Sequence, residues 1–280
     1  MGRLTHIVAY TSIVVIALIF LFLFIEGYRI FGYENPIHLF TGTDWQPTSE
    51  NPRYEMLTLI VGSLFVTIGA MAIGVPLAVG CAIYLSEIAP PWLGEVLKPA
   101  IEIIAGIPSV VIGFFALVVL APVISQVFQI PSGLTALNGA LMLAVMIIPT
   151  VETISEDALR SVPKGYRDAS LAMGATEWET IRHVVVPSAM PGIGVGVLLG
   201  FGRAIGETMV VLMATGNAAM IPTGFLDPVR TMTGTIAAEM GEVARGSPHY
   251  FALFMIGCVL FIISFGVNLA ANHLIRREER

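Results

Sequence analysis

Charged side chains are scarce in this 280-residue sequence. Asp, Glu, Lys and Arg together make up 12% of it, whereas 56% of the residues are hydrophobic. The mean hydropathy is +0.84. A soluble globule of this size has too small an interior to bury so many apolar side chains. The composition therefore predicts an integral membrane protein.

Lysines and catalytic motifs are also scarce. The two lysines are Lys98, which follows Leu97, and Lys164, which follows Pro163. Neither follows the glycines that a phosphate-binding P-loop requires. The sequence contains no His-Glu-x-x-His and no Gly-x-Ser-x-Gly arrangement, so it offers no metal cluster or nucleophile for a hydrolytic enzyme. We expect a chain that is not an enzyme and binds no cofactor, and any ATP-driven step would depend on a separate subunit.

The sequence also gives little support for a disulfide framework, a metal site or binding to nucleic acid. The two cysteines, Cys81 and Cys258, both lie inside apolar runs, which is unlike a disulfide framework or a metal site. The formal net charge of −6 argues against binding to nucleic acid. The partner that the composition favours is the lipid bilayer.

Long runs without charge indicate where the chain crosses the bilayer. They cover residues 7–25, 56–86, 103–151, 183–202 continued by 208–226, and 246–275. A helix needs about 20 apolar residues to cross the hydrocarbon core, so the run 103–151 holds two spans. Residues 131–133, Pro-Ser-Gly, mark the turn between them. The sequence predicts an all-α protein with six transmembrane helices.

The positive charges predict the orientation of these spans. Nine lysines and arginines fall on one side of the predicted topology and four on the other. The first group is Arg3, Lys98, Arg160, Lys164, Arg167, Arg182, Arg276, Arg277 and Arg280, and the second is Arg29, Arg53, Arg230 and Arg245. Positive residues gather in cytoplasmic loops, so both termini are predicted to be cytoplasmic. The first span is expected to remain as an anchor, because residues 26–29 do not form a small-residue cleavage site.

A polar segment lies between the fourth and fifth spans. Leu159, Val162, Tyr166, Ala169 and Met173 recur every three or four residues and give a helix one apolar face, with the neighbouring charges in water. Such a helix is typical either of a docking surface for a partner or of an amphipathic helix on the lipid surface. Glycines at positions 165 and 174 are expected to bracket it.

The fifth span carries a stripe of small and charged residues. At 100° per residue Gly192, Gly196, Gly200, Arg203 and Glu207 fall within about 80° of one another on a helix. The glycines are predicted to allow close helix packing, and the charges to avoid lipid. This face is expected to look into protein or into a water-filled path.

Arg203 and Glu207 admit two interpretations. A buried ion pair could fix helix packing. Alternatively, Arg203 contacts an anion on the translocation route, and Glu207 holds it in place or accepts a hydrogen bond from a protonated anion. Phosphate carries a proton at neutral pH and sulfate does not, which favours phosphate.

The spacing of the polar segment resembles the ATPase-docking loop of ABC importer permeases. That loop begins with an acidic residue and two small residues. Three further residues separate these from a glycine, and nine more separate the glycine from an aliphatic-x-aliphatic-Pro string. Four further strings resemble the C-type permease subunit of the high-affinity phosphate ABC importer, over most of residues 55–272. They are Ile154-Ser155-Glu156-Asp157-Ala158-Leu159, Gly202-Arg203-Ala204-Ile205-Gly206-Glu207-Thr208-Met209, Ile107-Pro108-Ser109-Val110-Val111 and Gly246-Ser247-Pro248-His249-Tyr250.

The resemblance implies a type I importer fold with defined partners and sites. The partners are a homologous A-type permease, two copies of one ATPase that holds ATP and Mg²⁺, and an external phosphate-binding protein. The family's transport residues correspond to Arg203 and Glu207. Its docking residues correspond to Asp168, Ala169, Ser170, Gly174 and Pro187, where Asp168 and Ser170 replace the family's Glu and Ala.

The chain thus divides into residues 1–55, an anchor helix with the first outer loop, and residues 56–280, a permease core with its docking loop at about 152–190. The predicted function is the import of inorganic phosphate across the cytoplasmic membrane, in a multi-pass permease. An ion-coupled secondary transporter is the alternative mechanism, but it has no need of a docking segment. A related oxyanion such as molybdate is the alternative substrate.

Smaller features carry their own expectations. Residues 26–55 are expected to form an ordered lid or docking edge rather than a solvated linker. Residues 235–245 are expected to form a short amphipathic helix that Gly246 ends. Residues 106–109 interrupt the helix at the start of the third span, where they either expose backbone N–H groups to an anion or only kink the helix. Glu152 is interpreted as a boundary carboxylate that reaches water.

Overall fold

The computed structural model describes residues 2–278, without the side chains of residues 2–5, 7–9, 91 and 270–278. Within this part of the chain six helices are long and apolar enough to cross a membrane, which confirms the predicted number. They are Tyr10–Gly32, Leu57–Ile88, Ser109–Phe128, Ala136–Ser161, Glu177–Ile205 and Pro248–Leu269. The side chains of Arg3, Arg276, Arg277 and Arg280 lie outside the described residues, and the orientation of the termini stays a prediction.

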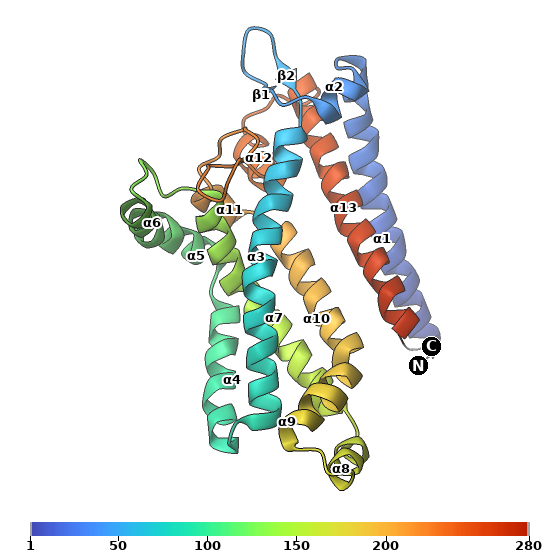
Figure 1. The fold of residues 1–280 in the computed structure, drawn as a ribbon. Helices are drawn as coiled ribbons and strands as arrows, with labels where there is room; N and C mark the ends of the chain where they lie inside the picture. Colours follow the sequence, from blue (N-terminus) through green and yellow to red (C-terminus); the bar gives the residue numbers. More distant parts are fainter. Residues whose placement is uncertain (1, 279–280) are drawn as a thin grey trace.

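The first and last helices form a pair at one side of the bundle (Figure 1). The helix α1 (Gly2–Tyr28) runs beside α13 (Pro248–Glu278). Their backbones approach closely at Gly27, where an added Cβ would lie 2.9 Å from the Met255 nitrogen. The rings of Phe20 and Phe261 pack 5.0 Å apart. A glycine and interleaved aromatic rings thus join the two ends of the chain.

Three helices form the centre of the molecule. The helix α7 (Ala136–Ser161) packs against both α3 (Leu57–Ile83) and α10 (Val186–Ile205). Small residues let α3 and α7 approach, since a Cβ at Gly74 would lie 2.8 Å from the Ile147 side chain. Ile147 and Val151 of α7 are fully buried. Close packing of small residues against branched ones is how helices associate without a hydrophobic driving force between them.

The third span, Ser109–Phe128, begins after a break in the helical backbone and contains a π-helical turn. The helix α4 (Pro91–Gly106) ends where Ile107 and Pro108 adopt extended backbone, and α5 (Ser109–Phe115), η3 (Ala116–Leu120) and α6 (Ala121–Phe128) follow. Proline disfavours helical backbone at the residue before it, so the predicted interruption at residues 106–109 is confirmed. The predicted turn at residues 131–133 is also confirmed, because it lies between α6 and α7.

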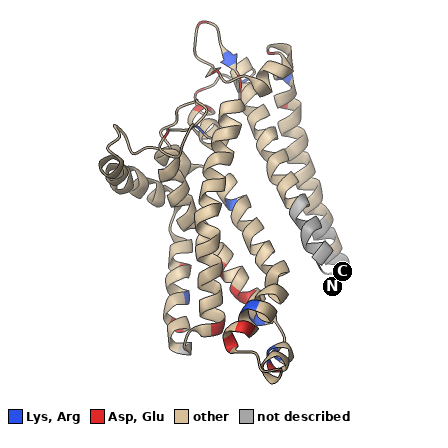
Figure 2. Ribbon diagram, viewed as in Figure 1, with Lys and Arg blue, Asp and Glu red and all other residues tan. Residues whose placement is uncertain are grey.

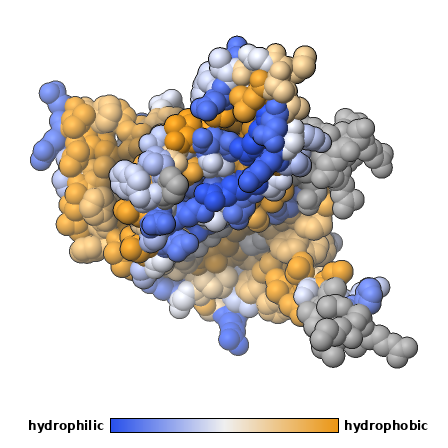
Figure 3. Space-filling view, turned by 90° about the horizontal axis from the view of Figure 1, so that it is seen from below, coloured by the Kyte–Doolittle hydropathy of each residue, from blue (hydrophilic) through white to orange (hydrophobic). Residues whose placement is uncertain are grey.

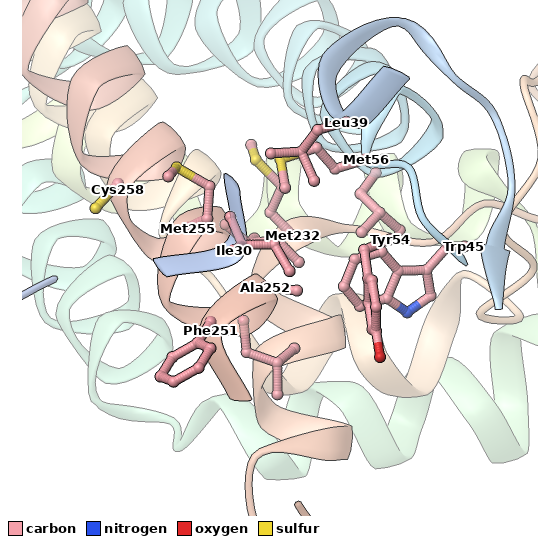
Figure 4. Close-up of a cluster of buried hydrophobic side chains, with 13 residues drawn as sticks. Ile30, Leu39, Trp45, Tyr54, Met56, Met232, Phe251, Ala252, Met255 and Cys258 are labelled. Carbon is pink, nitrogen blue, oxygen red and sulfur yellow. The ribbon is translucent and has the colours of Figure 1, made fainter. Parts of the chain in front are cut away.

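Residues 29–56 form an ordered cap, here called the hairpin end of the bundle. It contains η1 (Arg29–Gly32), α2 (Pro36–Thr41) and the antiparallel strands β1 (Trp45–Gln46) and β2 (Arg53–Tyr54). Ile30, Leu39 and Met56 are fully buried in a cluster with residues of α12 (Met232–Glu239) and α13 (Figure 4). This burial confirms the expected order of the segment, whereas its role as a lid or docking edge stays a prediction.

The short helix predicted at residues 235–245 is displaced. The observed α12 begins at Met232, after the Thr231 hydroxyl caps it by accepting from the Gly234 N–H at 3.1 Å. It ends at Glu239, which turns inward and accepts hydrogen bonds from the Trp45 indole at 3.2 Å and pairs with His249 at 2.7 Å. The prediction continued this helix to residue 245, whereas the observed helix ends at the residue that makes these tertiary contacts. Gly246 stands at φ +80° just before α13.

The opposite end of the bundle, here called the α8 end, is polar. It carries η2 (Tyr84–Ile88), α8 (Lys164–Ala172), α9 (Glu177–Thr180) and η4 (Ile181–Val185). Figure 2 shows charged residues concentrated there, and Figure 3 shows a hydrophilic band across that face with hydrophobic flanks. The remaining helix, α11 (Met209–Ala214), follows α10 in the interior.

Candidate functional site

Arg203 lies in the last turn of α10 and is partly buried. Its Nη1 donates a hydrogen bond to the Thr150 hydroxyl of α7 at 2.9 Å. Thr150 follows Pro149, which removes one backbone hydrogen bond from α7 at this level. Two central helices therefore position the guanidinium, and Thr150 is a site residue that sequence reasoning missed.

Glu207 does not continue the helical stripe. The helix α10 ends at Ile205 and Gly206 turns the chain, so Glu207 lies beyond the helix. Its Oε1 accepts from the backbone nitrogens of Met209 at 3.0 Å and Val210 at 3.3 Å, at the start of α11. A carboxylate satisfies free N–H groups at a helix start. The interpretation of Arg203 and Glu207 as an ion pair within one helix is wrong, since no such pair forms among the described side chains.

Hydroxyl groups surround the turn that carries Glu207. The Thr233 hydroxyl donates to the Glu207 carbonyl at 2.7 Å, and the Met232 N–H donates to Ser63 of α3 at 2.8 Å. A pocket too narrow to hold a water molecule lies at this point, lined by Glu207 and by the buried hydroxyl residues Ser63, Thr67, Thr231 and Thr233. Sequence reasoning missed this group, although the run Thr231-Met232-Thr233-Gly234-Thr235 was its signal.

The three glycines of α10 face α7 of the same chain. An added Cβ would lie 2.5 Å from the Ala158 Cβ at Gly192, 3.2 Å from the Val151 carbonyl oxygen at Gly196, and 2.6 Å from a Val151 methyl at Gly200. Each glycine thus allows a close approach of the two helices. The stripe positions Arg203 next to Thr150, and the packing partner is an intrachain helix.

The segment predicted to dock a partner projects from the bundle. Asp168 and Ala169 of α8 are exposed, as are Gly174 and Pro187, whereas Ser170 is partly buried and its hydroxyl lies 2.9 Å from the Thr180 hydroxyl. Leu159 and Val162, which sequence periodicity placed on this helix, are buried in the bundle instead. The reason is that α7 ends at Ser161 and Pro163 starts a new helix, so the apolar pattern spans a break.

Two carboxylates at the α8 end are buried rather than solvated. Glu152 is 2% exposed, which contradicts its interpretation as a residue that reaches water. Glu156 is equally buried and pairs with Lys98 at 2.8 Å and with Arg160 at 2.7 Å. This network joins α4 to α7. Among the described side chains, no group of three or more His, Cys, Asp or Glu is placed to hold a metal ion.

Gly174 ends α8 in a left-handed conformation, with φ at +89°. An added Cβ there would meet no atom within 4 Å, so space is not what requires glycine at this position. A left-handed backbone costs a side chain about 1–2 kcal/mol. We expect Gly174→Ala to destabilise the α8–α9 turn by that amount and to raise its backbone hydrogen exchange severalfold.

Gly165→Ala is the matched control, because Gly165 lies inside α8 with equally open surroundings. It should leave hydrogen exchange in the turn unchanged. Equal effects of the two alanines would contradict the role of the left-handed backbone.

Comparisons with known proteins identify the family to which this chain belongs. Residues 74–280 match the family of binding-protein-dependent transport system inner membrane components. The chain is 41% identical over 261 residues to a probable ABC transporter permease protein, YqgH, of Bacillus subtilis (strain 168), covering 92% of this chain and 84% of the relative. It is 35% identical to the phosphate transport system permease protein PstC of Xylella fastidiosa (strain 9a5c), covering 87% of this chain and 80% of that protein.

Solved structures share the fold at low sequence identity. A chain of the MetNI methionine ABC transporter in an inward facing conformation superposes with a TM-score of 0.63 at 19% identity, covering 83% of this chain and all of that one (100%). A chain of a bacterial alginate ABC transporter, in complex with a pentasaccharide-bound periplasmic protein, gives a TM-score of 0.66 at 13% identity, covering 98% and 94%. The chain therefore belongs to the family of binding-protein-dependent transport system inner membrane components, and it is the multi-pass permease of an ABC importer.

Proposed function

We propose that this permease moves inorganic phosphate across the cytoplasmic membrane. The observation that carries the proposal is Arg203, a partly buried guanidinium within the helical core that donates to the neutral Thr150 hydroxyl. A cation at this depth costs about 2.5–3.5 kcal/mol or more unless it is compensated. An anion in the pathway would compensate it. The name of the Xylella fastidiosa relative, a phosphate transport permease, supports phosphate as that anion.

The chemistry of the two charged residues favours a protonated oxyanion. One N–H group of the Arg203 guanidinium donates to Thr150, and its other N–H donors remain for a ligand. The geometry of a guanidinium matches the oxygens of a tetrahedral anion. Glu207 uses Oε1 to accept the N–H groups of α11. Its second oxygen is left to accept a hydrogen bond from the hydroxyl of hydrogen phosphate. Sulfate has no proton to donate and would be repelled by the carboxylate.

The same proposal assigns the orientation and the partners. The α8 end faces the cytoplasm, where Asp168, Ala169, Ser170, Gly174 and Pro187 contact a dimeric ATPase that binds ATP and Mg²⁺. The hairpin end faces outward, toward an external phosphate-binding protein. A homologous A-type permease completes the pathway. The exposed α8, which buries none of its residues in this chain, supports a docking role.

Competition among oxyanions tests the substrate. Cells that depend on this permease for phosphate should take up labelled phosphate, and a hundredfold excess of sulfate or molybdate should leave the initial rate unchanged. Unlabelled phosphate should suppress the rate. Strong competition by molybdate, the alternative substrate class, would overturn the assignment.

A further inference from the structure

Arg167 ties the exposed helix α8 to two other parts of the bundle. Its Nη1 forms an ion pair with the Glu87 carboxylate, in η2 at the end of α3. Its Nη2 donates to the Leu159 carbonyl oxygen of α7 at 2.9 Å. Sequence reasoning placed Arg167 in water with its neighbours. The structure instead leaves its side chain 25% exposed and that of Glu87 4% exposed.

The rest of α8 makes little contact with the helices behind it. None of its residues is buried. A pocket of about 710 Å³ separates it from the turn between η2 and α4, with Leu85, Ala89 and Gly94 on one side and Lys164, Asp168 and Leu171 on the other. Apolar packing therefore does not fill this gap. Arg167 lines this pocket, and its ion pair with Glu87 joins α8 to η2.

The carboxylate that receives Arg167 is held in a fixed orientation. The Ser86 hydroxyl donates to Glu87 Oε1 at 2.8 Å, which leaves the other oxygen to Arg167. Glu87 lies in a π-helical turn, a local rewinding that is frequent at functional positions in helices. Fixed geometry and burial make this pair stronger than a solvated surface ion pair.

The helix that carries Glu87 at one end reaches the hydroxyl-lined pocket at the other. Ser63 and Thr67 of α3 line the narrow pocket beside Glu207. Thr67 and Glu87 are twenty residues apart in the sequence, or about 30 Å along a helix at 1.5 Å per residue. If α3 is displaced at Glu87, its residues beside Glu207 would therefore move as well.

We infer that Arg167 is a positioning residue that transmits displacement of α8 to α3, and through α3 to the pocket at Glu207. The inference rests on the proposed function only in that α8 is the element an ATPase moves. It adds a named contact through which movement reaches the pathway. Loss of the contact should uncouple α8 from α3 without removing any docking side chain.

A distance measurement tests the contact without any transport assay. Spin labels at Leu171→Cys on α8 and Tyr84→Cys on η2, both exposed positions, would be placed in a Cys81→Ala, Cys258→Ala background. In the assembled complex the distance distribution should be narrow with Arg167 and should broaden clearly in Arg167→Gln. Arg160→Gln is the matched control. Arg160 also lines the pocket, and its replacement removes an ion pair with Glu156 that lies within α7. Lys98 still pairs with Glu156 in this variant.

Coupling is then measured as ATP hydrolysed per substrate molecule moved. Arg167→Gln and Glu87→Gln should each keep the ATPase bound and hydrolysing while uptake falls on the order of tenfold, a usual size for coupling between sites. Exchanging the charges, Arg167→Glu with Glu87→Arg, should restore most of the uptake. Arg160→Gln should not raise the ratio.

Unchanged distances together with normal uptake in Arg167→Gln would overturn the inference. So would a charge exchange that behaves like the sum of the single variants while the complex stays assembled. If the wild-type complex hydrolyses ATP but moves no phosphate, the proposed substrate fails. The distance measurement still decides the inference in that case.

Discussion

Replacing Arg203 with Gln is expected to abolish phosphate uptake while the complex remains assembled in the membrane. The amide keeps much of the side-chain volume and some capacity to donate hydrogen bonds, as Arg203 does to the Thr150 hydroxyl at 2.9 Å in the native chain. It loses the charge that would attract the anion. We expect initial uptake rates to fall at least a hundredfold, on the scale of about 3 kcal/mol for a hydrogen bond to a charged group. The rate is measured with labelled phosphate.

A second variant separates charge from positioning. Thr150→Val removes the hydroxyl partner but keeps the cation, so uptake should be reduced rather than lost. The double variant Arg203→Gln, Glu207→Gln removes both charges, and the amide oxygen introduced at position 207 could still accept the N–H groups of Met209 and Val210. Recovery of uptake in this double variant would show that transport needs neither charge, and the anion contact would be abandoned.

Gly200→Ala is expected to lower the thermal unfolding midpoint of the purified chain. The new Cβ would lie 2.6 Å from a methyl of the fully buried Val151. Real Cβ atoms do not approach this closely, so α10 must move away from α7. Overpacking of this kind costs about 1–3 kcal/mol. Gly200→Leu should prevent stable folding altogether.

Gly202 supplies the control for Gly200 within the same helix. An added Cβ there would meet nothing within 4 Å, so Gly202→Ala should leave the midpoint unchanged or raise it slightly, as alanine favours helix. Similar losses at both positions would mean that helix propensity or backbone flexibility, not contact with α7, explains the glycines. The assay is fluorescence-monitored unfolding in detergent.

Hydropathy sufficed to predict the helices because a bilayer imposes one length and one polarity on every span. It located the six spans, whereas the proline within residues 106–109 indicated the break at Ile107 and Pro108. Local patterns failed where a helix ended unexpectedly. The periodicity from Leu159 to Met173 crossed Pro163, and the stripe from Gly192 to Glu207 crossed the end of α10 at Ile205. A repeat of three or four residues is meaningful only while the helix continues.

The site residues that sequence reasoning missed are joined by tertiary contacts. Arg203 and Thr150 are 53 positions apart, and Arg167 and Glu87 are 80 apart. Each partner looks unremarkable within its own segment, since a threonine or a glutamate near a helix end has many roles. The packing of α10 against α7 brings the first pair together, and the position of α8 beside η2 brings the second pair together. Arg203 itself was identifiable because a cation inside an apolar run requires an explanation.

ATP-driven uptake by the purified complex tests the central claim most directly. The complex, isolated through a tag on this chain, would be reconstituted into vesicles with ATP and Mg²⁺ on the side of α8 and a loaded phosphate-binding protein on the other. Labelled phosphate should accumulate against its gradient with ATP and not without it. Accumulation that needs no ATP, or ATP-driven accumulation of molybdate with none of phosphate, would contradict a phosphate permease powered by a separate ATPase.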